Sequence, residues 1–243
     1  MVGFLLALQF LTIIPVTIKD VDEKKIARSI VYFPLAGLFI GMLLSAAYVP
    51  LCSLHLASLT VSIILVVALI VITGGMHLDG LADTGDALLS VKPKDQMLAI
   101  MRDPHIGVMG ALSLISIILL KIGLLFSLGA SAKIPALLLM CVLSRWSAVL
   151  TMYLFPYARQ DGKAKVFSRG MNAKIAALSS ILALVCSFAI WQLKGVAAFL
   201  VIGGFVYVSG KIISRSIGGM TGDTLGATIE LSEVATLLIA CAI

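Results

Sequence analysis

Residues 74–89 read Gly-Gly-Met-His-Leu-Asp-Gly-Leu-Ala-Asp-Thr-Gly-Asp-Ala-Leu-Leu and follow a long apolar run. The carboxylates Asp79, Asp83 and Asp86 lie at i, i+4 and i+7, which places them in one stripe on a helix. Like charges on one face repel, and near hydrocarbon they cost more. A divalent cation would compensate them, since clustered carboxylates suit Mg²⁺ or Mn²⁺ and such sites usually act on phosphate esters or diphosphates. The plainer alternative is a helix start whose acids complement the helix dipole.

The composition outside this stretch predicts an integral membrane protein. Of 243 residues, 60% are hydrophobic and 12% are charged, and the mean hydropathy is +1.13. That leaves too little polar surface to coat a soluble globule. Six or seven runs approach the roughly 20 apolar residues that a membrane-crossing helix needs, which predicts an all-α, polytopic fold in a single domain. The four cysteines form no CxxC pair, so neither disulfides nor a zinc site is expected.

The expected elements follow the apolar runs in order. Residues 2–16 predict an interfacial or re-entrant helix, without the features of a cleavable signal peptide. A turn through Pro50 and His55 should join the first two spans, and a short helix is expected over 94–101. A glycine-rich segment should follow the sixth span and lead into a last apolar helix that ends at 243. The spans are expected at about 31–51, 56–76, 106–128, 134–155, 175–192 and 196–207.

Basic residues predict the orientation of the chain in the membrane. Alternate loops at 19–28, 92–102, 159–174 and 211–215 hold 14 of the 18 lysines and arginines. By the positive-inside rule this side faces the cytoplasm, which predicts a multi-pass protein of the inner membrane. The aspartates of the acidic stretch, with Asp103 and Asp223, fall on the same side. The net charge of +6 is thus mostly topology, and no basic–aromatic pattern supports nucleic-acid binding.

Other polar residues near the acidic stretch are candidates for phosphate binding. Arg102 and His105 can hold phosphate oxygens, although they also suit a simple loop. His77 fits a ligand or an interfacial histidine equally well. Arg145 lies within a span, where an arginine usually has a partner or a ligand. Asp223 and Glu230 are seven residues apart and share a helix face, which suggests a second half-site facing the first.

Several motifs together resemble the cobalamin synthase family, whose activity is that of adenosylcobinamide-GDP ribazoletransferase. They are residues 77–86 (HLDGLADTGD), 101–107 (MRDPHIG) and 221–227 (TGDTLGA), with 8–12 (LQFLT) and 32–37 (YFPLAG). The resemblance implies a polytopic inner-membrane enzyme that joins adenosylcobinamide-GDP to α-ribazole or its 5′-phosphate, releases GMP and depends on Mg²⁺. One departure is Ile13-Ile14 before Pro15, where a basic residue is expected, and this weakens the case for an N-terminal phosphate contact.

The resemblance and the residues together suggest roles at the site. Asp79, Asp83 and Asp223 would hold Mg²⁺, with Asp86 a further candidate ligand, and Asp86 or Asp83 would act as the catalytic base. The partners are the corrinoid nucleotide, α-ribazole and the lipid bilayer, and a homo-oligomer is compatible with the sequence. The residues assigned to substrate binding are His77, Arg102, Asp103, His105, Arg145 and Thr221.

Two other functions fit parts of the pattern. A CDP-alcohol phosphotransferase of phospholipid synthesis also places aspartates at a membrane surface, but its motif has arginine where this chain has Asp83. A cation-coupled secondary transporter would use carboxylates near the membrane midplane. Here the acids gather at one face, and two matched halves with broken helices are not evident.

Overall fold

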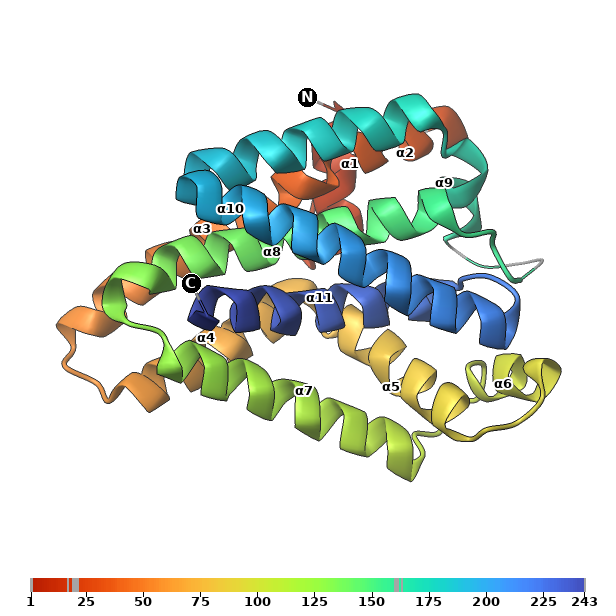
Figure 1. Ribbon diagram of the computed structural model, residues 1–243, viewed down its shortest axis with the longest axis horizontal. Helices are drawn as coiled ribbons and strands as arrows, with labels where there is room; N and C mark the ends of the chain where they lie inside the picture. The colour runs from red at the N-terminus through yellow and green to blue at the C-terminus, as the bar shows by residue number, and fades with distance from the viewer. Residues whose placement is uncertain (1, 17, 19–21, 160–161, 163, 243) are drawn as a thin grey trace.

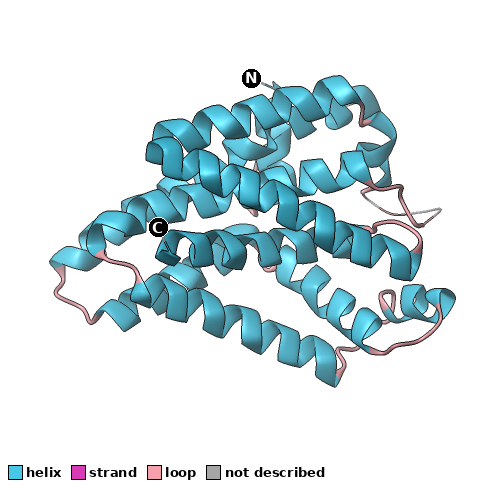
Figure 2. Ribbon diagram, in the orientation of Figure 1, coloured by secondary structure: helices cyan, strands magenta, loops and turns pink. Residues whose placement is uncertain are grey.

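The protein is helical almost throughout the residues that the computed structural model describes, which are 2–16, 18, 22–159, 162 and 164–242. Figure 2 shows no strand in these ranges, where the only β-pairing is an isolated bridge between Tyr157 and Met220. The predicted all-α class is therefore confirmed. Lys19, Asp20 and Lys163, which contributed to the predicted orientation or its charged loops, lie outside the described residues.

The helices follow the predicted spans to within about one helical turn through α8. The expected short helix over 94–101 is present as α6. Their bounds are α1 Val2–Leu11, α2 Glu23–Ser29, the 3-10 turn η1 Ile30–Tyr32, α3 Phe33–Ser53, α4 Ser58–Thr73, α5 Met76–Leu89, α6 Lys94–Ile100, α7 Val108–Ser127, α8 Ala130–Leu154, α9 Lys165–Gly170, α10 Ala173–Ile217 and α11 Gly222–Ala242.

Helix α10 is a hairpin of two arms. Its 45 residues would extend about 68 Å if straight, more than twice the hydrocarbon thickness of a bilayer. The backbone leaves the helical region at Trp191 and Gln192, and the arms run in opposite directions (Figure 1). A Cβ placed on Gly195 would lie 1.9 Å from the carbonyl oxygen of Ser187, so the arms are in close contact. The two predicted spans are thus present, but the second continues to Ile217 because Lys211 and Arg215 carry the helix beyond its apolar part.

The number of crossings agrees with the sequence. Within the described residues, five helices are long and apolar enough to cross a membrane, and α4 with α5 forms a sixth, bent candidate. Counting the arms of α10 separately brings the total into the predicted range of six to seven. Large apolar side chains such as Leu119, Val185 and Leu200 are exposed on the outer helix faces. In water such faces would be unstable, whereas lipid suits them.

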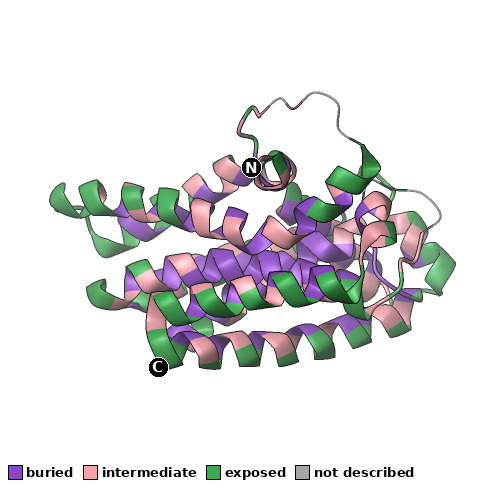
Figure 3. Ribbon diagram, turned by 90° about the horizontal axis from the view of Figure 1, so that it is seen from above, coloured by how far each residue is buried: buried purple, intermediate pink, exposed green. Residues whose placement is uncertain are grey.

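Helix α8 forms the centre of the bundle and packs against α3, α10 and α11. Its middle is buried, as the purple ribbons at the centre of Figure 3 show. Glycines allow the closest of these contacts, because a Cβ on Gly37 of α3 would lie 2.1 Å from the carbonyl oxygen of Cys141. The two helices therefore pack backbone to backbone.

A glycine elbow between α4 and α5 positions the acidic stretch. Gly74 and Gly75 have φ values of 63° and 67°, a left-handed conformation that other residues adopt at a cost. The axes of α4 and α5 differ in direction by 92° across these two residues. Helix α5 consequently leaves the line of α4 and packs between α7 and α11 (Figure 1).

Two predicted boundaries are wrong. Pro50 does not end the first span, because α3 continues to Ser53 and the chain turns at His55, which has a φ of 54°. The TGDTLGA motif does not precede the last helix but forms its first two turns, since α11 already begins at Gly222. Thr221 starts this helix earlier than the apolar pattern indicated by exchanging hydrogen bonds with Thr224.

Candidate active site

The acidic stretch is helical, as its spacing predicts, and two of its carboxylates border an open cavity. Asp79 is exposed and Asp83 is half-buried, one helical turn apart on α5. They line a cavity of about 550 Å³, whose other walls include Gly75 of the elbow and Pro104 and Ile106 of the loop before α7. This volume lies within the range of about 300–1,000 Å³ that is typical of small-molecule sites.

Asp223 joins this group because α5 and α11 are in backbone contact. A Cβ on Gly80 would lie 2.6 Å from the carbonyl oxygen of Asp223, so only glycine permits the approach. Asp79, Asp86 and Asp223 all act electrostatically on Asp83. The predicted meeting of the acidic stretch with the second motif at Asp223 is therefore present.

Arg159 faces the same group, although the sequence indicated only a basic loop there. Its Nη2 lies 2.8 Å from Oδ2 of Asp223, and both side chains are largely buried. A short backbone pairing places it, because the amide of Met220 donates to Pro156 and the amide of Ala158 donates to Met220, each at 2.8 Å. Nothing in the spacing of the sequence reveals this pairing, since it joins residues about 60 positions apart through two hydrogen bonds.

Asp86 faces away from the cavity and holds the start of α7. Its Oδ2 accepts a hydrogen bond from the amide of Gly107 at 2.7 Å, and its Oδ1 accepts one from the amide of Gly110 at 2.8 Å. A carboxylate at a helix N-terminus satisfies amides that lack partners and complements the helix dipole. The structure therefore gives Asp86 an anchoring role, which makes it a poorer candidate than Asp83 for the base or a metal ligand.

The loop before α7 carries three further predicted residues. Nδ1 of His105 lies 2.7 Å from Oδ1 of Asp103, which also accepts the His105 amide at 3.0 Å. These hydrogen bonds lower the pKa of Asp103 below its usual value, because they stabilise the charged carboxylate. Arg102 is exposed at the start of the loop. The loop borders the cavity through its apolar residues, while these polar side chains remain accessible to a bound ligand.

Arg145 is not part of this site, which corrects its assignment to substrate binding. Its side chain is fully buried and its Nη1 pairs with Glu233 and Ser144. Lys121 pairs with the same Glu233 and, at 2.6 Å, with Glu230. We call Lys121, Arg145, Glu230 and Glu233 the buried ion network. Burial of charge is expensive unless it is paired, so these residues satisfy one another, and Glu230 does not form the expected half-site with Asp223.

His77 and Thr221 are both buried beside the aspartates. His77 is 4% exposed, and neither ring nitrogen has a hydrogen-bond partner. It lines an inner cavity of about 60 Å³ together with Gly222 and Gly226. Thr221 is fully buried and its hydroxyl caps α11, accepting the Thr224 amide at 3.2 Å. His77 thus keeps hydrogen-bonding capacity for a ligand, whereas Thr221 positions the helix that carries Asp223.

The donor chemistry of the site fits a divalent cation. Asp79, Asp83 and Asp223 supply hard carboxylate oxygens on two helices in backbone contact. Within the described ranges, however, no three histidine, cysteine or acidic side chains are grouped as a metal site, and Asp223 is turned to Arg159. The residues present are therefore suitable ligands that the structure does not show gathered around one point.

Replacing Gly80 with alanine is expected to lower activity by separating α5 from α11. The new methyl group would meet the backbone of Asp223, which has no flexible side chain to give way. Turnover should fall because Asp223 moves relative to Asp83. Gly123→Ala on α7 is the matched control, since a Cβ there meets nothing within 4 Å. Equal turnover of the two variants would contradict the role of this contact.

Comparisons with known proteins agree with this site. The sequence profile of the family described as cobalamin-5-phosphate synthase matches residues 3–241. Proteins named adenosylcobinamide-GDP ribazoletransferase from Escherichia coli O45:K1 (strain S88 / ExPEC) and Escherichia coli K12 (strain DH10B) are each 37% identical over 240 residues, covering 95% of this chain and 96% of theirs. No solved structure matches significantly. The chain thus belongs to the cobalamin-5-phosphate synthase family.

Proposed function

We propose that this protein joins adenosylcobinamide-GDP to α-ribazole, or to α-ribazole 5′-phosphate, and releases GMP. The family and the names of the relatives support this reaction. The observation that carries it is the meeting of Asp79 and Asp83 with Asp223 and Arg159 beside an open cavity. A group of carboxylates and an arginine at the surface of a membrane bundle suits a diphosphate substrate.

The proposed site binds the diphosphate of adenosylcobinamide-GDP between α5 and α11. Asp79, Asp83 and Asp223 would hold Mg²⁺, which when bound neutralises charge on the diphosphate and on the leaving GMP. Arg159 lies within reach of the same oxygens and would pair with the substrate, while Arg102 and His105 would contact it from the loop.

The chemical step needs a base, and Asp83 is the best placed group. The acceptor hydroxyl attacks the phosphorus that bears cobinamide, the phosphorus–oxygen bond to GMP breaks, and the hydroxyl proton passes to a carboxylate. Asp86 is engaged by two amides, whereas Asp83 lies half-buried at the cavity wall. We therefore assign the proton to Asp83. The uneven distribution of basic residues supports a site that faces the cytoplasm in the inner membrane.

A turnover assay tests the proposal. Purified protein in detergent or nanodiscs, given adenosylcobinamide-GDP, should release GMP only when α-ribazole and Mg²⁺ are both present. Removing the metal with a chelator should stop release, and adding Mg²⁺ back should restore it, because the carboxylates alone would repel the diphosphate. Absence of GMP release from folded protein with any divalent metal would overturn the proposal and favour the transporter alternative.

A further inference from the structure

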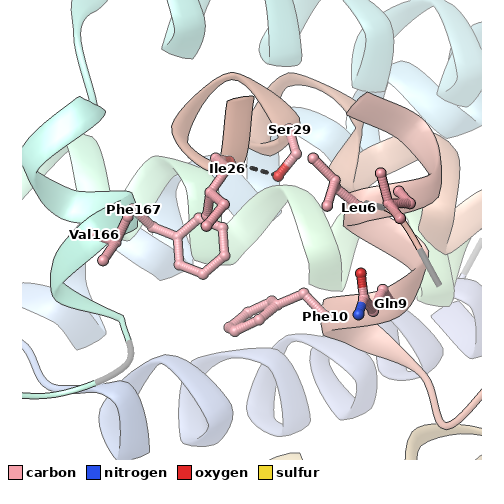
Figure 4. Close-up of a pocket in the computed structure, with 8 residues that line it drawn as sticks. Leu6, Gln9, Phe10, Ile26, Ser29, Val166 and Phe167 are labelled. Atoms are coloured by element: carbon pink, nitrogen blue, oxygen red, sulfur yellow. Dashed lines mark hydrogen bonds between the residues drawn. The ribbon is translucent and has the colours of Figure 1, made fainter. Parts of the chain in front are cut away.

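A second, larger opening lies beside the acidic site, between α1, α2 and α9. This groove has a volume of about 500 Å³, within the range of about 300–1,000 Å³ for small-molecule sites. Figure 4 shows its lining, with Phe10 and Phe167 opposite Leu6 and Ile26, and the Gln9 carboxamide at the edge. Most of the surface is apolar.

Aromatic rings form one side of the groove. The ring centroids of Phe10 and Phe167 are 4.4 Å apart, and Phe33 stacks on Phe10 from behind at 5.8 Å. Such faces bind planar rings by stacking, and the exposed amide of Gln9 offers a donor and an acceptor beside them. The combination suits a flat heteroaromatic group with a few polar atoms.

The groove leads toward the acidic site. Phe10 and Phe167 also line the inner cavity that contains His77 and Gly222, so these two rings are the wall between the spaces. Gly222 directly precedes Asp223. At about 60 Å³ the inner cavity has room for about two water molecules, and His77 is its only polar side chain. A ligand in the groove therefore lies one ring's thickness from an unpartnered histidine next to the proposed catalytic group.

We propose that this groove binds the aromatic base of the acceptor, with the benzimidazole of α-ribazole stacked on Phe10 and Phe167. This inference rests on the proposed function, which supplies a planar heteroaromatic acceptor. The ribose would then extend past His77 toward Asp223 and Asp83. The corrin ring with its side chains is too bulky for the groove and is left to the cavity beside Asp79.

A phospholipid is the main rival occupant. The groove lies in a membrane protein, and its helices α2 and α9 expose Arg28 and Arg169, which suit a lipid phosphate as well as an acceptor 5′-phosphate. An acyl chain, however, would leave His77 and Gln9 without partners, whereas a base and ribose can satisfy both. Continuity with the acidic site also has no purpose for a lipid. These points favour the acceptor.

Steady-state kinetics on Phe167→Ala tests the inference. Base–aromatic stacking is worth about 1–3 kcal/mol by alanine substitution, which corresponds to roughly a 5- to 150-fold weaker interaction. The KM for α-ribazole should rise by this factor, while the KM for adenosylcobinamide-GDP and kcat at saturating acceptor should change less than about twofold. The control is Phe188→Ala, which removes an exposed phenylalanine of α10 and should leave all three unchanged.

Further arms separate folding defects and failure of the proposed function. Because Phe167 is a core residue, Phe10→Leu and Gln9→Ala provide milder variants that should also raise the KM for α-ribazole. Direct binding of α-ribazole to protein in nanodiscs, without corrinoid, should weaken in the same order. Normal turnover with an unchanged KM for α-ribazole in all three variants would overturn the groove assignment alone. A tightly bound phospholipid lost from Phe167→Ala, with that KM unchanged, would identify a lipid site instead.

Discussion

Replacing Asp83 with asparagine should abolish GMP release while the protein remains folded in the membrane. The substitution keeps the size of the side chain but removes its charge, its capacity to accept a proton and most of its affinity for Mg²⁺. Loss of a general base alone costs about 10²- to 10⁴-fold in rate. Loss of a metal ligand adds to this, so turnover should fall below detection.

The same substitution should not destabilise the fold. Asp83 is surrounded by Asp79, Asp86 and Asp223, which act on it electrostatically, and removing one charge relieves this repulsion. Thermal unfolding in detergent should therefore occur at the same temperature or higher, a pattern typical of residues kept for function. The matched control is Asp95→Asn on α6, an exposed acid that should leave both turnover and unfolding unchanged.

Magnesium titration then distinguishes the two roles of Asp83. A residue that only holds metal should be rescued in part by higher Mg²⁺, because weaker binding is offset by concentration. A base should not be rescued at any Mg²⁺ concentration. Asp79→Asn is the comparison, since Asp79 is exposed and is proposed only as a ligand. Full turnover of Asp83→Asn would contradict both roles and the site itself.

Much of the fold could be predicted because apolar runs report membrane spans directly. The polar break at Gln192–Lys194 marked the reversal within α10 before any contact was known. Gly74-Gly75 likewise marked the end of α4, but a pair of glycines does not specify a direction. The 92° bend depends on the packing of α5 against α7 and α11, which is set by residues far away in sequence.

The site could be predicted only as far as local spacing allowed. The i, i+4 stripe correctly brought Asp79 and Asp83 together, but the partners of Asp86 are backbone amides 21 and 24 residues later, which carry no side-chain signature. An arginine within a span indicated a partner or a ligand for Arg145. The choice between them depended on Glu233, 88 residues away, and one sequence does not reveal such a pairing.

Replacing Glu233 with alanine should destabilise the protein strongly. Glu233 is fully buried and pairs with Lys121 and Arg145, so its removal leaves two buried cations with Glu230 as the single counterion. Removing one partner of a buried ion pair costs about 3–5 kcal/mol, a large part of the roughly 5–15 kcal/mol by which proteins are stable. We expect a lower yield of folded protein and unfolding at lower denaturant concentration.

A double variant tests whether unpaired charge, rather than lost packing, causes the effect. Lys121→Met combined with Glu233→Leu leaves Arg145 and Glu230, so the buried region is neutral again while its volume is approximately kept. If charge balance controls stability, the double variant should be more stable than Glu233→Ala, an interaction opposite to simple addition of two losses. Equal or greater destabilisation would instead assign the network's contribution to its hydrogen-bond geometry. Because Glu233 and Asp223 lie on the same helix, a stable double variant that retains turnover would further show that the network supports α11 without taking part in the chemistry.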